Sequence, residues 1–353
     1  MTVPQARPGP DEQRGEPREL PPLTRRAVLK RAGIGGAAVL GGGLLAHELI
    51  PRTDDTSYAA AGHADAYAGA AGHTYGHATL PPPGLGEQAL EAVTVPPPFD
   101  GRRGVTRSFD LPVTERQLVV GDGVVADAWT YAGSVPGPIL RATEGDLVAV
   151  RLDNRTAHPH NLHLHGRHAP EMDGWEPIPP GSGFTYEVVA EPFGLHPYHC
   201  HVAPIAEHIG RGLYGTMIVD PPGGRPPAHE FVLVLGGWDL DGDGRNELVC
   251  WNGVAGFFAT YPLKVPVGEL VRVYLVNMLE HEPLASFHLH AQTFDVYATG
   301  TSLEPDGHTD VVTLSQGERA IVEFRLLRPG RYMFHPHQSW LADRGAMGWF
   351  AAI

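Results

Sequence analysis

Short runs of alternating apolar and polar residues recur along the chain from residue 105 to its end. Residues 117–120 and 124–131 flank a turn at 121–123, and the run 147–152 follows a polar entry at 144–146. Alternation with a period of two predicts half-buried strands, and the turn residues between the runs predict short connections. From residue 106 on, no long segment has the 3.6-residue period of a helix. The pattern predicts an all-β sandwich.

The pattern then restarts in the second half of the chain. Gly145-Asp146 leads into a run that ends at Asn154, and Gly268-Glu269 leads into a run that ends at Asn277. In each half an H-x-H pair follows this asparagine, and a second H-x-H pair closes the half. Two copies of one sandwich, each of ordinary domain size, account for the repeat. We therefore predict a first domain at 105–225 and a second at 226–353.

The first 104 residues differ from this pattern. Residues 1–50 contain Arg25-Arg26 and then an apolar, Gly-rich run at 34–45, which resembles a twin-arginine export signal. This predicts an extracellular, periplasmic or envelope-associated protein. The run is short for a membrane span, but an uncleaved anchor stays open because Ala46-His47-Glu48 is not an A-x-A cleavage pattern. Residues 51–104 are rich in Ala, Gly and Pro, which predicts a disordered linker.

Composition narrows the possible partners. The 353 residues include 40 acidic and 26 basic side chains, a net charge of −14, which argues against nucleic acid as a partner. There are 20 histidines, and only two cysteines, Cys200 and Cys250. If Cys200 binds a metal, no intramolecular disulfide remains, and the fold must be held by its core. Cys250 is expected to be a small buried hydrophobe.

The sequence around Cys200 is the strongest chemical signal in the chain. His199 and His201 flank the cysteine, and His208 follows after a short loop. A thiolate among imidazoles is a soft donor set suited to copper. On a strand, alternation directs Cys200 to one face and both flanking histidines to the other, so that one strand can reach two metal sites. Taken alone, the segment is also compatible with a buried structural cysteine beside surface histidines.

Further histidines decide between these interpretations. On a strand, His163 and His165 share one face, and His160, an odd step away, can lie on the other. This predicts one site from His160, Cys200 and His208, and a second face with His163, His165, His199 and His201. The second half supplies His288, His290, His335 and His337. It has Ala285 where His160 would fall and no cysteine between its last two histidines. The second half is therefore expected to lack the thiolate site.

Across residues 105–353 the chain resembles the two-domain multicopper oxidases of the small-laccase group, in the subtype with its blue copper in the first domain. The motifs that carry the resemblance are Val135-Pro136-Gly137-Pro138, the Gly145-Asp146 strand entry, His160-x-x-His163-x-His165-Gly166, Tyr198-His199-Cys200-His201, His288-x-His290 and His335-x-His337. The resemblance implies two tandem cupredoxin-like Greek-key β-sandwiches. It also implies a homotrimer with a copper cluster between the first domain of one subunit and the second domain of its neighbour.

The resemblance implies about four coppers per chain. A type 1 copper would lie on His160, Cys200 and His208, and a type 2 copper on His163 and His288. The type 3 pair would lie on His165, His199, His201, His290, His335 and His337. The family often has an axial methionine where this chain has Leu213, which predicts a three-coordinate type 1 copper with a raised reduction potential. Met217 is expected in the core.

The implied activity is laccase-like: one-electron oxidation of phenolic or similar reductants, coupled to reduction of dioxygen to water. A cuprous, ferrous or manganous ion is the alternative reductant. Asp173 resembles the family's acid near the type 2 copper and is the candidate proton relay; the alternative interpretation is that it only starts the Asp-Gly turn. Two rival functions are a copper nitrite reductase and a non-catalytic electron-transfer protein. Nitrite reductases have Asp at the position of His163 and no histidine at that of His201, and a simple electron carrier would not need His288 and His337.

One other motif suggests a metal. Residues 239–244, DLDGDG, resemble the start of a calcium loop. The bidentate glutamate expected at loop position 12 is replaced by Cys250, so an acidic turn is the favoured interpretation.

Overall fold

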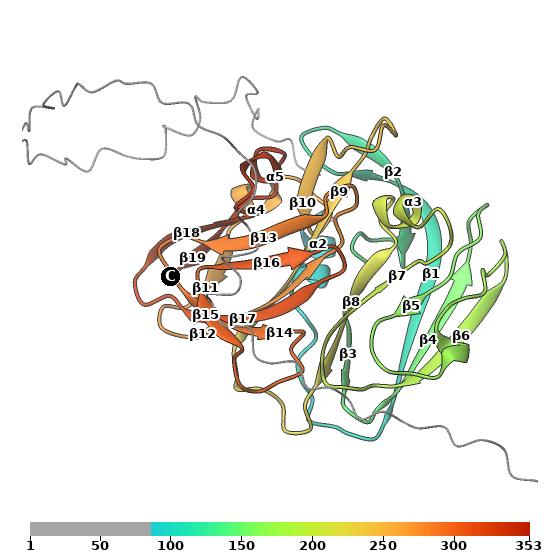
Figure 1. Cartoon of the computed structure of the whole chain (residues 1–353), viewed down its shortest axis with the longest axis horizontal. Coiled ribbons are helices and arrows are strands. Elements are labelled where there is room, and N and C mark those ends of the chain that lie inside the picture. Colours follow the sequence, from blue (N-terminus) through green and yellow to red (C-terminus); the bar gives the residue numbers. More distant parts are fainter. Residues whose placement is uncertain (1–85) are drawn as a thin grey trace, which may run out of the picture. The chain divides into compact units, whose positions relative to one another are not determined.

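The computed structural model describes residues 86–353. The predicted export signal and residues 51–85 of the predicted linker lie outside these described residues. In the described part, strands predominate and the helices are short (Figure 1). No helix within residues 86–353 is long and apolar enough to span a membrane.

The C-terminal part of the predicted linker contains a helix. Helix α2 (Gly86–Thr94) precedes the first strand, and its Leu90 and Val93 are buried. Leu90 joins the core of the second sandwich, and Nδ2 of Asn252 donates a hydrogen bond of 2.9 Å to Oγ1 of Thr94. The prediction of disorder rested on composition averaged over the whole stretch, which conceals two apolar residues one helical turn apart.

The first sandwich consists of two four-stranded sheets (Figure 1). In spatial order, one sheet contains β2 (Val125–Tyr131), β1 (Thr106–Val119), β4 (Leu147–Asn154) and β6 (Gly183–Val189). The other contains β3 (Leu140–Thr143), β8 (Tyr214–Asp220), β7 (Gly194–His199) and β5 (His163–Leu164). The short helices are η1 (Pro170–Met172), between β5 and β6, and α3 (Ile205–Gly210), between β7 and β8.

The second sandwich has a six-stranded and a five-stranded sheet. The first contains β10 (Leu248–Trp251), β9 (His229–Trp238), β12 (Leu270–Asn277), β17 (Arg319–Arg325), β14 (Phe294–Ala298) and β15 (Gly307–Thr309). The second contains β11 (Leu263–Val265), β19 (Gly348–Ala352), β18 (Gly330–His335), β13 (Leu284–Leu289) and β16 (Val311–Ser315). The helices are α4 (Phe257–Thr260) and α5 (Ser339–Asp343).

The two sandwiches share one connectivity. Strand β1 pairs with β4 in parallel, and β9 pairs with β12 in parallel. Likewise β3 lies parallel to β8, and β11 lies parallel to β19. In both halves these parallel pairs combine with antiparallel neighbours, which is the mark of Greek-key rather than simple hairpin connections. The prediction of two tandem Greek-key β-sandwiches is confirmed.

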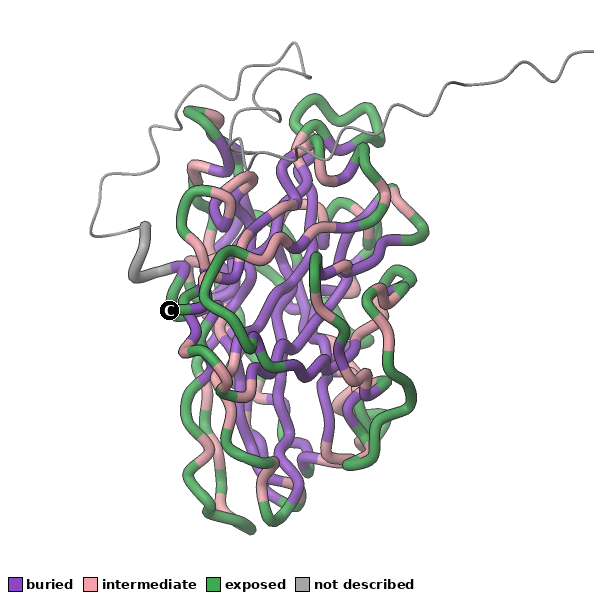
Figure 2. The backbone as a smooth tube through the Cα atoms, turned by 90° about the vertical axis from the view of Figure 1, so that its left-hand side faces the viewer, coloured by how far each residue is buried: buried purple, intermediate pink, exposed green. Residues whose placement is uncertain are grey.

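Each sandwich has its own core, and a third apolar cluster joins them (Figure 2). In β4 the alternate residues Val148, Val150 and Leu152 are fully buried in the first core, as the alternation predicts. Strand β9 is instead buried along nearly its whole length. Its Leu233 faces the second core and its Val234 faces the joining cluster. A strand covered on both faces reads as a continuous apolar run.

A buried ion network also lies between the sandwiches. Arg141 of β3 donates two hydrogen bonds to the carboxylate of Asp220, at 2.7 and 2.9 Å, and a third to the carboxylate of Glu230 in β9 at 2.7 Å. Arg272 of β12 donates to Glu230 at 2.9 Å and to Glu323 at 2.6 Å. Because both guanidinium groups are paired on more than one side, their burial is compensated. The network links β3 and β8 of the first sandwich to the six-stranded sheet of the second.

Candidate metal centres

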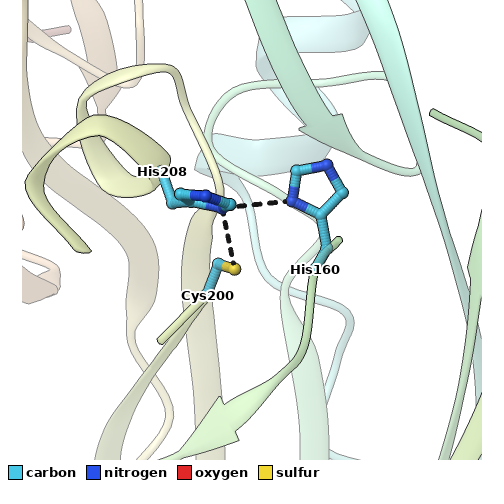
Figure 3. A group of neighbouring side chains, drawn as sticks. All are labelled: His160, Cys200 and His208. Carbon is cyan, nitrogen blue, oxygen red and sulfur yellow. Dashed lines mark hydrogen bonds between the residues drawn. The ribbon is translucent and has the colours of Figure 1, made fainter. Parts of the chain in front are cut away.

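The structure brings His160, Cys200 and His208 together inside the first sandwich (Figure 3). Nδ1 of His208 lies 3.2 Å from Sγ of Cys200 and 3.2 Å from Nδ1 of His160. His160 and Cys200 have no exposed surface, and His208 is 4% exposed. Two imidazole nitrogens and one sulfur therefore converge on a single buried point, as the sequence predicts.

Backbone hydrogen bonds hold the three donors in place. His160 precedes β5 and forms an isolated bridge with Ile178, Cys200 follows β7 directly, and His208 belongs to α3. The N–H of Cys200 donates to the carbonyl of Leu213 at 3.0 Å, and the N–H of Leu213 donates to the carbonyl of His208 at 3.2 Å. Leu213 is fully buried beside the site.

The protonation of these donors suits a soft metal ion. Burial, followed by the neighbouring His208 and His158, lowers the pKa of His160 to about 3. Burial also lowers the pKa of His208, and it raises the pKa of the Cys200 thiol to about 11. Both imidazoles are thus neutral, while the thiol needs a nearby cation before it ionises. Neutral imidazoles and one sulfur, with no carboxylate among them, form a donor set that fits copper.

A first histidine quartet, His163, His165, His199 and His201, lies on the other side of the Cys200 segment. His163 of β5 is directly opposite His199 of β7. Nε2 of His165 lies 3.2 Å from Nε2 of His199, and the rings of His163 and His201 are 5.5 Å apart. The predicted alternation around Cys200 is therefore observed, because the cysteine faces inward while both flanking histidines join the quartet.

A second quartet, His288, His290, His335 and His337, occupies the equivalent place in the second sandwich. His288 of β13 is opposite His335 of β18, and Nε2 of His290 lies 2.9 Å from Nε2 of His335. The ring of His337 lies 5.2 Å from that of His288. Ala285 is fully buried in the second core. The position where His160 would fall in the repeat therefore carries a methyl group that packs in this core.

The two quartets orient their rings in the same way. Nδ1 of His199 lies 2.9 Å from the carbonyl oxygen of Cys200, and Nδ1 of His335 lies 2.8 Å from that of Pro336. Nδ1 of His288 similarly lies 2.8 Å from the carbonyl oxygen of Asp310. An Nδ1–H that donates to a carbonyl leaves Nε2 free as a metal donor. His199, His335 and His288 are therefore oriented to bind a metal through Nε2.

Asp173 lies beside the first quartet. Its Oδ1 is 3.1 Å from Nδ1 of His163 and 3.5 Å from Nε2 of His168. It also begins a turn, because Gly174 has φ +77° and a Cβ there would collide with the carbonyl of Leu162. Asp173 therefore both begins a turn and has its carboxylate beside the first quartet, and its role as a proton relay stays a prediction. A carboxylate held against an imidazole of the quartet is placed to exchange protons with it.

The structure adds residues that the motifs did not reveal. Asn161 is 1% exposed, and its Oδ1 accepts a hydrogen bond of 2.7 Å from the N–H of His201 and lies 3.5 Å from Sγ of Cys200. The indole of Trp129 contacts the rings of both His160 and His208. Asn161 lies within the histidine-rich segment 158–165, but the sequence alone gave it no role. No motif near Trp129 indicated that it would contact the site.

Within residues 86–353, the quartet histidines that are close enough to share a metal form two separate sets, one in each sandwich. His163, His165 and His199 form one set, and His288, His290 and His335 form the other. Each quartet alone offers half of the eight histidines that the resemblance implies for one cluster.

The remaining motifs lie away from the histidines. Asp239 accepts hydrogen bonds from the N–H groups of Gly242 and Gly244 at 2.7 and 2.9 Å, which closes an acidic turn. Carboxylate oxygens of Asp239, Asp241, Asp243 and Glu247 also lie within 4.8 Å of one another, so the turn stays a prediction beside the calcium interpretation. Cys250 is fully buried in the cluster between the sandwiches, and burial raises the pKa of its thiol to about 12. Met217 lies in β8 within the first core. The expected core positions of Cys250 and Met217 are confirmed.

Known proteins with this arrangement are copper oxidoreductases. Two family models, both described as multicopper oxidase, match residues 112–224 and 239–352. A copper-containing nitrite reductase of Neisseria meningitidis serogroup B is 32% identical over 289 residues, covering 73% of each chain. The crystal structure of a multicopper oxidase, 41% identical, aligns with a TM-score of 0.71 over 75% of this chain and 96% of its own. A copper nitrite reductase from Nitrosomonas europaea, 28% identical, aligns with a TM-score of 0.65 over 70% of this chain and 94% of its own. The chain therefore belongs to the multicopper oxidase family, as a copper-binding oxidoreductase of two cupredoxin-like domains.

Proposed function

We propose that the protein is a laccase-like oxidase, which couples one-electron oxidation of phenolic or similar reductants to the four-electron reduction of dioxygen to water. The observation that carries the proposal is the pair of complete histidine quartets, one in each sandwich. In the first quartet, His163 and His201 are decisive, because nitrite reductases have an aspartate at the former position and no histidine at the latter.

The ligand assignment follows from the three donor sets. His160, Cys200 and His208 would hold a type 1 copper. His163 and His288 would hold the type 2 copper, and the type 3 pair would be held by His165, His199, His201, His290, His335 and His337. When bound, copper supplies the one-electron redox chemistry that links the reductant to dioxygen.

The residues around these donors perform the remaining tasks. Cys200 is covalently joined to His199 and His201, so a single stretch of chain connects the thiolate site with the first quartet. Leu213 contributes no axial donor and keeps water from the thiolate site, both of which favour a high reduction potential. Asp173, 3.1 Å from Nδ1 of His163, would hold and deliver protons that the reduction of dioxygen consumes.

The active protein is proposed to be a homotrimer. Each chain presents two half-sites in separate sandwiches, and cyclic symmetry lets the first quartet of one subunit face the second quartet of its neighbour. The copper nitrite reductase relatives support such an assembly by similarity. Export by the twin-arginine route, from the Arg25-Arg26 motif, and the division at 105–225 and 226–353 remain part of the same proposal.

A copper nitrite reductase is the second candidate function, because the Neisseria meningitidis relative carries that name and matches 73% of the chain. Copper content and electron acceptor separate the two. On fully loaded protein we expect about four coppers per chain and consumption of dioxygen with hydroquinone as the reductant. About two coppers per chain, with nitrite consumed in place of dioxygen, would establish the nitrite reductase instead.

A further inference from the structure

The indole of Trp129 covers the thiolate site. Its ring centroid lies 4.9 Å from that of His160, nearly perpendicular at 70°, and 4.8 Å from that of His208. The backbone N–H of Trp129 donates a hydrogen bond of 2.9 Å to the backbone carbonyl of Arg211, which connects strand β2 to the residue that follows α3. His160 has no exposed surface, His208 is 4% exposed, and Trp129 is 5% exposed. The indole therefore packs against both imidazoles, and only a small part of its own surface is exposed.

The outer side of this indole forms the floor of a surface hollow of about 400 Å³. The exposed ring of His158 lies 4.9 Å from the indole, and the guanidinium of Arg211 lies 4.8 Å from its centroid. Two exposed carboxylates, Glu115 and Asp127, also line the hollow, beside Arg116 and Gln117. Glu115 is the direct cross-strand partner of Trp129. The hollow combines aromatic surface with hydrogen-bond acceptors, and its volume suits a single-ring molecule.

We propose that this hollow is the reductant site and that Trp129 is its electron-entry residue; the inference rests on the oxidase function proposed above. The reductant class is a single-ring hydroxyarene that packs against the exposed ring of His158 and the exposed part of the Trp129 indole, and donates hydrogen bonds to Glu115 or Asp127. The hydroxyarene would give up one electron through the indole to the thiolate site, where His160, Cys200 and His208 would hold the copper(II) that accepts it as copper(I). Its O–H bond breaks, the proton goes to a wall carboxylate and then to water, and a neutral aryloxyl radical leaves.

A larger hollow of about 650 Å³, which shares Asp127 and Arg211 with the first and is also lined by residues of α3, provides the competing outcome. Its walls include Glu207, Asp239 and Asp241, which would attract a metal cation. It offers no aromatic ring in contact with His160 or His208. Reduction by a hydroxyarene should therefore depend on Trp129, whereas reduction by ferrous ion at the acidic hollow should not.

The test compares Trp129→Leu and Trp129→Phe with the matched control Trp349→Phe. Trp349 also has a stacked guanidinium, from Arg331 at 4.7 Å, but it lies on β19 of the second sandwich. The protein is mixed with hydroquinone without dioxygen, and bleaching of the blue absorption is followed. We expect Trp129→Leu to bleach at least about tenfold more slowly, Trp129→Phe to be intermediate, and Trp349→Phe to stay within about twofold of the parent.

A second readout does not depend on copper. Calorimetry of hydroquinone binding to copper-free protein should give one site per chain, weakened about three- to tenfold by Trp129→Leu and unchanged by Trp349→Phe. Copper content and blue absorption are measured for each variant to check that it keeps the thiolate site. If Trp129→Leu does not keep this site, the comparison uses Trp129→Phe instead.

The possible failures are distinguishable. Equal bleaching of the parent and the Trp129 variant would overturn the electron-entry role while the oxidase function stands. Rapid bleaching by ferrous ion with none by hydroquinone would also overturn it, and would assign reductant entry to the acidic hollow. If the parent protein shows no blue absorption or consumes no dioxygen, the proposed oxidase function is wrong. If hydroquinone then also fails to bind the copper-free protein, the hollow is not a hydroxyarene site.

Discussion

His199 and Cys200 are adjacent in the chain yet face opposite sides of the same strand end, and Nδ1 of His199 lies 2.9 Å from the carbonyl oxygen of Cys200. The sulfur points to the thiolate site, whereas the imidazole belongs to the first quartet. The two donor sets are thus connected both by covalent bonds and by a hydrogen bond. This is the shortest connection that the described chain provides between them.

Replacing Cys200 by Ser tests this connection. The hydroxyl is a harder and less readily ionised donor than the thiolate, so we expect loss of the blue absorption and a fall from about four coppers per chain to about three. Oxidation of hydroquinone should fall to background, although the quartets remain loaded. Copper analysis, absorption spectra and dioxygen uptake check the three expectations. Activity retained by Cys200→Ser would show that electrons take another route.

Asp173→Asn tests proton delivery. The amide keeps the size of the side chain and the turn before Gly174, but it cannot exchange a proton at neutral pH. Because general acid–base catalysis contributes about 10²- to 10⁴-fold, we expect dioxygen reduction by pre-reduced protein to slow at least about 100-fold. The blue absorption and its rate of bleaching should be unchanged, since the carboxylate of Asp173 lies against His163 and His168, which are not donors of the thiolate site.

Asp122→Asn is the matched control for Asp173. Asp122 also precedes a glycine with positive φ, Gly123 at +70°, and it is exposed at the turn between β1 and β2. Its substitution should leave dioxygen reduction within about twofold of the parent. If Asp173→Asn also behaves like this control, the carboxylate only supports the turn.

The sequence was sufficient to predict the parts of the site that depend on local periodicity. Alternation alone placed Cys200 and His199 on different faces, and the repeated H-x-H pairs identified both quartets. Trp129 could not be found in this way, because it lies 31 residues before His160 and only the packing of β2 against α3 brings the rings together. Arg141 is a similar case: nothing near it in the chain indicates that Glu230 of the other sandwich will be its partner.

The ion network between the sandwiches should make stability depend on acid pH. Burial raises the pKa of Glu230, but hydrogen bonds from Arg141, Tyr274 and Arg272 outweigh it, so that the net pKa lies below its ordinary value of 4.5. A carboxyl with a depressed folded-state pKa contributes stability that is present above the ordinary value and is lost as pH falls through the folded value. Below pH 4.5 the melting temperature should therefore decline as Glu230 takes up a proton.

Glu230→Gln removes this contribution. We expect the free energy of unfolding near neutral pH to drop by about 1–3 kcal/mol, because both guanidinium groups keep one other carboxylate partner. The melting temperature of the variant should then depend less steeply on pH below 4.5 than that of the parent. Glu304→Gln, at an exposed position, should reproduce the parent curve. If the melting temperatures of the parent and of Glu230→Gln decline equally steeply below pH 4.5, Glu230 is not the source of the pH dependence.

Mixing of two inactive chains tests whether the cluster forms between subunits. His165→Ala destroys the first quartet and keeps the second, whereas His335→Ala does the reverse. If one cluster needs the first quartet of one chain and the second of its neighbour, an interface between the two variants can hold both intact quartets. Random assembly of equal amounts into cyclic trimers makes about one quarter of all interfaces intact. Coexpressed chains should then recover about a quarter of the dioxygen uptake of the parent, while each variant alone stays inactive. No recovery in mixed trimers verified by mass spectrometry would place both quartets of each cluster in a single chain.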